Sequence, residues 1–426
     1  MNNRDRDRQY IWHPYTQMSG ADHLCIVKGE GACIFDENGN KYIDVVSSWW
    51  TNLHGHAHPY IAQRIAAQAH QLEHLIFAGF THPPAIELAE RLLRHLPVNQ
   101  EKLFFSDNGS TAVEVSLKMA IQYWRNKGEH RTKVIAFRNG YHGDTFGAMS
   151  IGERGIFNQP FHDLLFEVIF IDAPVPGKQA ASLMQLQRAI AKNPSSIACF
   201  IFEPLVQGAG GMLMHDPDAL NALISCCKEH GILTIADEVM TGFGRTGKFF
   251  ASDYLLDKPD MFCLSKGLTG GFLPMAITSC TSEVFNAFLS KKDDAINKTF
   301  YHGHSYTANP LGCAAALASL DLMEATATRE HIERIAGKHA LFRELIAGDP
   351  KILDVRQCGT ILAIELKTAT GSSYNSSVRD TIYHFFLQRG IIMRPLGNTM
   401  YLMPPYCISD DDLDYIYRSI ENFLKQ

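Results

Sequence analysis

Two residues with complementary chemistry, Asp237 and Lys266, each follow a short apolar run of the chain. The run 232–236 has the length of a buried strand and leads directly into Asp237. Lys266 comes shortly after a second such run, 261–264, and precedes a glycine-rich stretch. Because open α/β sheets bind ligands at the carboxyl ends of their strands, we expect this carboxylate and this amine to meet at one rim.

An amine beside a carboxylate, with glycines that allow close approach, is the set of groups that pyridoxal phosphate (PLP) requires. Lys266 would form the Schiff base with the cofactor, and Asp237 would keep the pyridine nitrogen protonated so that the ring accepts electrons. Taken alone, such a lysine is more often a solvated surface charge, and such an aspartate a loop or cap residue. The whole stretch 231–271 favours the cofactor interpretation.

Two further stretches predict the remaining contacts to a phosphorylated planar ligand. SDNGSTAVE (106–114) joins a strand end to a helix start, where Gly109 and Ser110 would form an anion site, the alternative being an ordinary helix cap. RNGYHGDT (138–145) follows another strand, so Tyr141 would cover one face of the ring and Val239 the other. The alternative for Tyr141 is a core aromatic residue.

Three other sites contain residues suited to a substrate. Glu203, in IFEPLVQGAGG (201–211), either faces the substrate or only shapes the loop. Arg394 is either a surface charge or a clamp for a carboxylate, with which its planar fork pairs bidentately. Neighbouring residues on a strand point to opposite sides, so at least one of Trp49 and Trp50 in SSWW should line a cavity or an interface. Core packing of both remains the alternative.

Bulk properties restrict the class of protein. The chain has 426 residues, a formal net charge of −6 and a hydrophobic fraction of 46%. Mild acidity predicts no nucleic-acid partner, and we expect no membrane, because no apolar run reaches the roughly 18 residues of a span. The N-terminus MNNRDRDRQY is charged and has no apolar core, so we expect no signal peptide, and the ten cysteines include no C-x-x-C pair. We therefore expect reduced thiols and a cytoplasmic location, and no metal.

The elements that must position these residues alternate between strand and helix, which indicates a mostly parallel sheet covered by helices on both faces. The predicted strands are 102–105, 134–137, 168–171, 197–202, 232–236 and 261–264. Two long helices, 311–326 and 329–347, are then followed by short strands and a closing helix from Asp410, which predicts a smaller α+β domain. We expect residues 1–55 to pack with that small domain (326–426), and 56–325 to form the large α/β domain.

The segment around Asp237, GFGRTG (242–247) and Lys266 resembles the class III aminotransferases, which are PLP-dependent enzymes of fold type I. The resemblance covers nearly the whole chain. It implies PLP as cofactor, a homodimer with active sites at its interface, and a two-stage transamination in which Lys266 moves the proton. The segment HGHSYTANP (302–310) would reach the phosphate in the partner subunit through Ser305.

Further segments of the sequence resemble those of the branch of this family that serves biotin biosynthesis. They are WHPYT (12–16), SSWW (47–50), FRNGYHGDTFGAMS (137–150), PLVQGAGGM (204–212) and RPLGNTMYLMPPY (394–406). This resemblance implies 8-amino-7-oxononanoate as amino acceptor and S-adenosylmethionine as donor. The residues that it implies for the substrate pocket are Tyr15, Trp49, Trp50, Tyr141, Lys266, Gly303, Arg394 and Tyr401, with Tyr15 also among the catalytic residues.

One departure leaves the donor open. Some members of the family have a Pro-Thr pair where this chain has His304-Ser305, and some relatives use lysine instead of S-adenosylmethionine. The serine keeps a hydroxyl for the phosphate. Two other functions remain: an aminotransferase for ω-amino acids, which SSWW and YLMPPY disfavour, and a PLP-binding protein without turnover, which the intact Lys266 and Asp237 disfavour.

Overall fold

The computed structural model describes residues 1–20, 23–155, 157–290, 297–368 and 378–426. Its main body is a seven-stranded sheet in the order β4-β12-β11-β10-β7-β5-β6. The strands are β4 (Gln100–Ser106), β5 (Lys133–Phe137), β6 (Val168–Ile171), β7 (Ile197–Phe202), β10 (Leu233–Asp237), β11 (Met261–Leu264) and β12 (Ala276–Thr281). All six predicted strands are present, within a few residues of their expected bounds.

The strand β12 was not predicted from the sequence. It pairs antiparallel with both β11 and β4, whereas the other neighbours of the sheet run parallel. Its sequence AITSCT contains as many polar residues as is typical of a loop, but every residue of the strand is buried. Thr278 and Ser279 tolerate that burial because their hydroxyls donate to the Ala112 carbonyl and the Gln100 side chain, at 2.8 and 2.7 Å.

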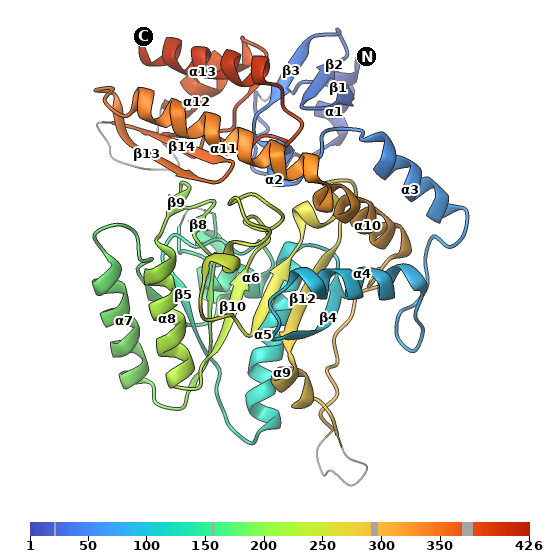
Figure 1. Ribbon diagram of the computed structural model, residues 1–426, viewed down its shortest axis with the longest axis vertical. Coiled ribbons are helices and arrows are strands. Elements are labelled where there is room, and N and C mark those ends of the chain that lie inside the picture. Colours follow the sequence, from blue (N-terminus) through green and yellow to red (C-terminus); the bar gives the residue numbers. More distant parts are fainter. Residues whose placement is uncertain (21–22, 156, 291–296, 369–377) are drawn as a thin grey trace.

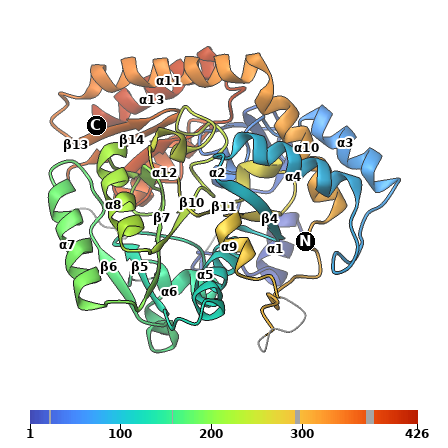
Figure 2. The ribbon, with the colours of Figure 1, turned by 60° about the horizontal axis from the view of Figure 1, so that its bottom comes forward.

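Helices cover both faces of this sheet, as expected for strands that are apolar throughout (Figures 1 and 2). Along β7, Phe200 and Phe202 pack in the core formed with α7 (Gln179–Lys192) and α8 (Pro217–Glu229). The alternate residues Cys199 and Ile201 belong to the core formed with α5 (Gly109–Asn126) and α6 (Phe146–Ile151). The period of two along the strand therefore distributes its side chains between two helical layers.

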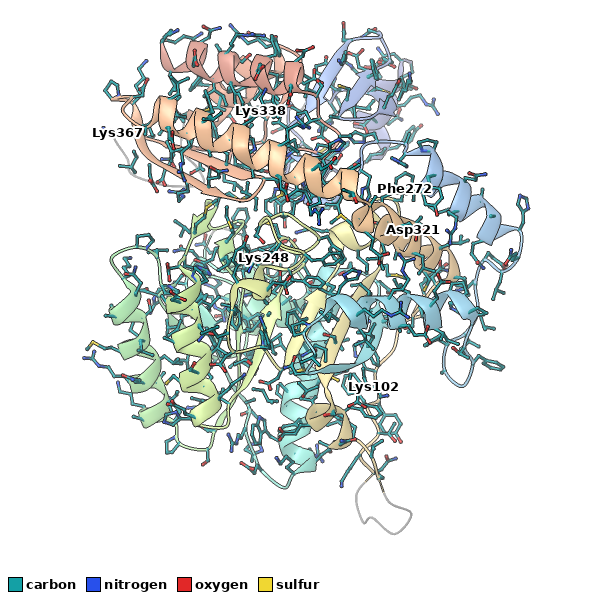
Figure 3. The ribbon with its side chains drawn as sticks, viewed as in Figure 1. Lys102, Lys248, Phe272, Asp321, Lys338 and Lys367 are labelled. Carbon is teal, nitrogen blue, oxygen red and sulfur yellow. The ribbon has the colours of Figure 1, made fainter. Side chains whose placement is uncertain are left out.

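Three helices close the side of the sheet next to β4. They are α3 (Pro59–Ala69), α4 (Pro83–His95) and α10 (Pro310–Glu324). Asp321 on α10, labelled in Figure 3, accepts hydrogen bonds from Tyr60, Arg64 and Arg91 at 2.6, 3.1 and 2.7 Å. One carboxylate thus joins the three helices.

The C-terminal part forms a second, smaller layer. Helices α11 (Thr326–Ile346), α12 (Val378–Leu387) and α13 (Asp410–Leu424) accompany a three-stranded sheet of β13 (Ile352–Cys358), β14 (Ile361–Leu366) and β16 (Thr399–Leu402). The strand β16 lies in the stretch RPLGNTMYLMPPY (394–406) and was not predicted. Short elements complete the chain: β8 (Val206–Gln207), β9 (Leu213–Met214), α9 (Ser282–Asn286) and 3-10 helices at Gln159–Leu164, Ala251–Tyr254 and Lys266–Thr269.

The N-terminal segment contains α1 (Asn3–Tyr10) and the strands β1 (Ile26–Glu30), β2 (Cys33–Asp36) and β3 (Lys41–Asp44). The C-terminal strand β15 (Ile391–Ile392) extends this sheet by pairing parallel with β3. Figure 1 shows β1–β3 beside α13, away from the large sheet. On this basis we propose that 1–55 and 326–426 form one structural unit beside the large domain 56–325.

The SSWW stretch corrects one expectation. It is not a strand but a short irregular helical turn, α2 (Ser47–Trp50), in which Ser48 has φ 62°. The Asp44 carboxylate holds this turn by accepting from the Ser48 N–H at 2.6 Å. Among the described residues, no helix is long and apolar enough to cross a membrane, and all ten cysteines are free.

Candidate active site

The central strands bring three titratable groups to one rim. The parallel register aligns Ala236 of β10 with Phe202 of β7, so the next residues, Asp237 and Glu203, are neighbours. On the other side Asp237 aligns with Cys263 of β11, three residues before Lys266. Lys266 begins a short 3-10 helix with φ 46°, a left-handed conformation that is uncommon for a residue with a side chain. The expected meeting of Asp237 and Lys266 at one rim is therefore observed.

A cavity of about 720 Å³ lies at this rim. Nine of the predicted site residues line it: Tyr15, Trp49, Trp50, Gly109, Ser110, Tyr141, Asp237, Val239 and Lys266. Both tryptophans reach the cavity, although their turn is not a strand. The structure therefore gathers the catalytic, ring-facing and anion-binding candidates from five separate stretches of the chain.

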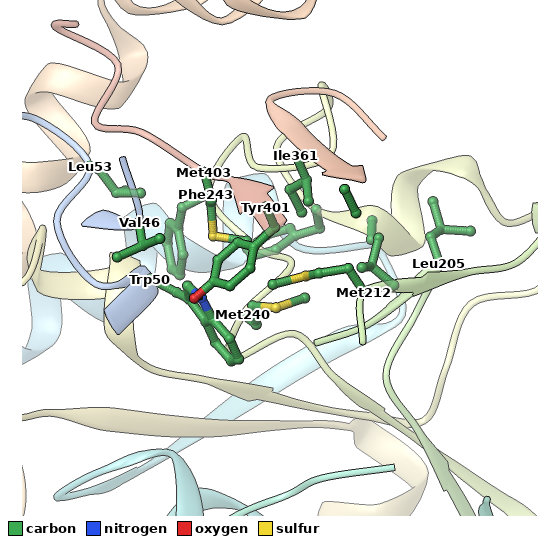
Figure 4. Close-up of a cluster of buried hydrophobic side chains, with 14 of the residues drawn as sticks. Val46, Trp50, Leu53, Leu205, Met212, Met240, Phe243, Ile361, Tyr401 and Met403 are labelled. Carbon is green, nitrogen blue, oxygen red and sulfur yellow. The ribbon is translucent and has the colours of Figure 1, made fainter. Parts of the chain in front are cut away.

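Four predicted residues do not line the cavity. Gly303 and Ser305 are exposed on the segment before α10. Tyr401 is buried behind the cavity wall, where its hydroxyl accepts a hydrogen bond from the Trp50 indole nitrogen at 3.0 Å (Figure 4). The half-buried Arg394 guanidinium lies over the Trp49 ring, 4.5 Å from its centroid. Among the described residues, no carboxylate pairs with Arg394.

Asp237 is held in place from within the protein. The His142 Nδ1 lies 2.6 Å from Asp237 Oδ2, and the Val239 N–H donates to Oδ1 at 3.1 Å. Burial alone would lower the pKa of His142, but the hydrogen bond and charge of Asp237, with the charge of Glu203, raise it. Sequence reasoning missed this histidine, although its place directly after Tyr141 at a strand end was an available signal.

Glu203 connects two loops at the base of the cavity. Its carboxylate accepts from the Tyr141 N–H at 3.0 Å and from the Gly208 N–H at 2.9 Å. Burial raises the pKa of this carboxyl to about 7. Glu203 therefore lines the cavity and fixes the backbone of both loops, and its contact with a substrate stays a prediction.

Lys266 is in an environment suited to a neutral amine. Burial lowers its pKa to about 8, although the charges of Asp237 and Glu203 act in the opposite direction. The Nζ atom lies 4.6 Å from the centroid of the Trp50 ring. An amine with this pKa can accept and return a proton near neutral pH, which an ordinary surface lysine does far less readily.

The start of α5 has free N–H donors of the kind that the predicted anion site requires. Asn108 caps the helix at the Thr111 N–H, and among the described residues no acceptor receives the N–H groups of Gly109 and Ser110. A Cβ atom on Gly109 would lie 2.7 Å from Val239 Cγ1, so only glycine allows Val239 to pack here. These free donors at the positive end of a helix fit a phosphate group, and the neighbouring Asp237, Tyr141 and Val239 fit the ring of PLP.

Tyr15 forms part of the opposite wall. Its hydroxyl donates a short hydrogen bond to Asp144 and lies 3.2 Å from the Tyr141 hydroxyl. Its ring is 5.4 Å from that of Trp49. Burial, followed by the contacts with Tyr15 and Asp144, raises the pKa of the Tyr141 phenol, which therefore stays protonated. The aromatic rings of this wall are suited to contact with an alkyl chain.

Comparison with known proteins agrees with this geometry. The family model described as Aminotransferase class-III matches residues 15–424. A protein of Synechococcus elongatus named adenosylmethionine-8-amino-7-oxononanoate aminotransferase is 48% identical, over 98% of this chain and 99% of its own length. The solved structure of the enzyme with that name from Methanocaldococcus jannaschii has a TM-score of 0.93 and 37% identity, covering 99% of this chain and 98% of its own. An amine transaminase from an uncultivated Pseudomonas species, solved with PLP bound, has a TM-score of 0.90 and 32% identity, covering 97% of each chain.

Proposed function

The chain belongs to the class III aminotransferase family, and we propose that it transfers an amino group from S-adenosylmethionine to 8-amino-7-oxononanoate. The product would be 7,8-diaminononanoate, for biotin biosynthesis. The names of its relatives support the substrates. The observation that carries the proposal is the convergence of Lys266, Asp237 and the free helix start at Gly109 on one cavity.

PLP is the cofactor for which these residues are suited. When bound, it supplies a conjugated ring that delocalises the electron pair left after a proton leaves the substrate carbon. Gly109 and Ser110 would bind its phosphate, and Asp237 its ring nitrogen. Tyr141 and Val239 would contact its two faces.

Lys266 would transfer the proton that the reaction moves. Its lowered pKa leaves a share of the side chain as free amine at neutral pH, ready to take a proton from the amine-bearing carbon of the substrate and to return it one step later. The negative charge of Asp237, held by His142 Nδ1, would stabilise a protonated nitrogen facing it. Tyr15 would orient the substrate from the opposite wall.

The substrates would use the aromatic side of the cavity. Trp49, Trp50 and Tyr15 can contact an alkyl chain, and a ring face also suits the sulfonium cation of S-adenosylmethionine. Arg394 is the candidate partner for the carboxylate of the oxononanoate, with Tyr401 supporting Trp50 behind the wall. Binding both substrates in turn at one cavity implies ping-pong kinetics.

We also propose a homodimer whose active sites lie at its interface. Gly303 and Ser305 are exposed and do not line the cavity of their own chain. The same face carries exposed aromatic side chains, including Tyr301 and Tyr306 at 76% and 64%. In a dimer, the Ser305 hydroxyl of one copy could reach the phosphate in the other. A loss of PLP affinity in Ser305→Ala, in a protein that sediments as a dimer, would support this arrangement.

The test of function is a pair of single-turnover reactions with the PLP-loaded chain. S-Adenosylmethionine alone should lose one equivalent of amino groups per chain, and later addition of 8-amino-7-oxononanoate should give one equivalent of 7,8-diaminononanoate. Lysine alone, tested in parallel, shows which donor is used. Lys266→Ala is the control and should give neither product while melting near the wild-type temperature. Failure of the wild type with both donors would contradict the proposal.

A further inference from the structure

The N-terminal segment brings two imidazole rings and a carboxylate to one point. His13 Nε2 lies 3.0 Å from both oxygens of Asp7, and His23 Nδ1 lies 3.1 Å from Asp7 Oδ2. The two rings stack, with centroids 3.8 Å apart and an interplanar angle of 27°. One ligand atom from each residue lies within 4.8 Å of those of the other two. This cluster lies outside the cavity described above.

The spacing and atom types fit a transition-metal ion. Imidazole nitrogen and carboxylate oxygen bind zinc at about 2.0–2.2 Å, so two such ligands of one tetrahedral ion lie about 3.3–3.5 Å apart. The nitrogen–oxygen separations of 3.0 and 3.1 Å are a few tenths of an ångström shorter, so a small outward movement of the side chains would admit the ion. Two nitrogens and one oxygen suit zinc, nickel or cobalt, whereas calcium and magnesium take oxygen ligands. The side chains remain 23–28% exposed, which leaves access for the ion and for water as a fourth ligand.

The cluster also closes a loop that reaches the active site. Asp7 lies on α1, whereas His13 and His23 lie on the stretch that follows it. Between the two histidines is Tyr15, whose hydroxyl bonds to Asp144 and Tyr141 in the cavity wall. A bond from each histidine to one ion would fix both ends of the loop that contains Tyr15.

We propose that Asp7, His13 and His23 bind a divalent ion of the zinc, nickel and cobalt class, and that the bound ion fastens the loop bearing Tyr15 to α1. The metal takes no part in the transamination. Its effect is to restrict the positions of His13 and Tyr15 relative to α1. In its absence the same residues make ordinary hydrogen bonds, with the carboxylate accepting from two neutral or protonated imidazoles.

The test uses the full-length, PLP-loaded chain after dialysis against a chelator. Zinc titration by calorimetry should give one ion per chain, and cobalt should give a visible ligand-field band. His23→Gln and Asp7→Asn should each weaken zinc binding at least about tenfold, since even outer-shell changes cost 10–100-fold. The matched control is His130→Gln, an exposed loop histidine, which should bind zinc as the wild type does.

The fastening is tested separately by limited trypsin digestion at Arg8. Zinc should slow this cleavage in the wild type and in His130→Gln, but not in His23→Gln. Absence of zinc binding, or unchanged affinity in both His23→Gln and Asp7→Asn, would overturn the site. Zinc binding that leaves the cleavage rate unchanged would overturn the fastening role. Neither readout depends on the substrates of the enzyme.

Discussion

At the scale of single residues, the site depends on buried charges whose protonation is set by their neighbours. Lys266 has a pKa lowered to about 8, and Glu203 a pKa raised to about 7, both mainly by burial. Asp237 lies between the two in the strand register and is held by His142. The result is an amine that is partly deprotonated near neutral pH beside a fixed carboxylate, a pairing suited to proton transfer at that pH.

We predict that Lys266 titrates near pH 8 in the chain without PLP. Reductive methylation with ¹³C-formaldehyde should give one lysine resonance that shifts near pH 8 and is absent in Lys266→Ala. Because the folded pKa lies below the unfolded value, the protonated lysine destabilises the fold below pH 8. That penalty disappears as pH rises toward 10.5. A Lys266 resonance that shifts only near pH 10.5 would contradict this prediction.

The His142–Asp237 contact is testable by a rescue experiment. His142→Phe removes the hydrogen-bond donor that lies 2.6 Å from Asp237. It should slow the half-reaction with the amino donor at least about tenfold, which is less than the roughly 10²–10⁴-fold lost when a catalytic acid or base is removed. His142→Asn, whose amide can donate in place of Nδ1–H, should recover much of that rate. The dissociation constant of the donor should stay unchanged. Equal losses in both variants, with lower melting temperatures, would indicate a purely structural role.

Substitution of Arg394 tests whether this residue binds the substrate carboxylate or only stabilises the fold. Arg394→Ala should raise the KM for the oxononanoate about tenfold or more, since a charge-assisted hydrogen bond contributes about 1.5–3 kcal/mol. The half-reaction with S-adenosylmethionine should change less. Because no described carboxylate pairs with Arg394, its loss should barely affect the melting temperature. Equal losses in both half-reactions, with a lower melting temperature, would count against the clamp.

At the scale of elements, the acid pair after β10 serves two purposes. Asp237 faces the cavity, whereas Glu238 points into the core. There it accepts from the Thr241 hydroxyl at 2.6 Å and from the Ala251 and Ser252 N–H groups at 3.1 and 2.7 Å. One carboxylate thus holds both ends of the loop that contains GFGRTG. Successive residues of an extended chain point to opposite sides, which explains why Asp237 faces the cavity and Glu238 faces the core.

We predict that Glu238→Ala lowers the free energy of unfolding by about 2–4 kcal/mol, because it leaves buried N–H groups without acceptors. Calorimetry should show a lower melting temperature even in the chain without PLP. The matched control, Glu229→Ala at the exposed end of α8, should stay within about 0.5 kcal/mol of the wild type. If Glu238→Ala lowered the free energy of unfolding no more than the control does, Glu238 would not stabilise the loop that contains GFGRTG.

At the scale of the whole molecule, a buried arginine joins distant parts of the chain. Arg245 in GFGRTG is 1% exposed and donates to the Pro404 carbonyl at 2.8 Å and to the Asn52 carbonyl at 3.2 Å. Its guanidinium also lies 5.2 Å from the centroid of the Tyr406 ring. Arg245 therefore connects the large domain, the segment after Trp49-Trp50 and the C-terminal part.

Arg245→Met keeps the volume but removes both donors, so we expect a loss of about 2–4 kcal/mol in stability. Hydrogen exchange should rise around residues 45–55 and 400–406, because these segments lose a shared anchor. Lys248→Met, at an exposed position nearby, is the control and should change neither quantity. If hydrogen exchange became faster in neither segment, the anchoring role of Arg245 would be contradicted.

The sequence by itself determined six of the seven strands of the large sheet, the fold class and the meeting of Asp237 with Lys266. Apolar runs of strand length predict buried strands, and parallel pairing places their ends at one rim whatever the details of packing. The same local signals identified Gly109 and Tyr141, because both lie in the loop or helix start that follows a strand, β4 or β5. These features depend on the order of residues along the chain, which is fully present in the sequence.

Only the tertiary structure decided which side chains touch across the fold. The contact of His142 with Asp237 spans 95 residues, and that of Trp50 with Tyr401 spans 351. Arg245 and the polar strand β12 depend on partners equally distant in sequence. Hydrophobic periodicity indicates which face of an element is buried, but the partners are chosen by packing among many segments at once. For this reason the position of the site could be predicted, whereas the supports of Asp237, Trp50 and the GFGRTG loop could not.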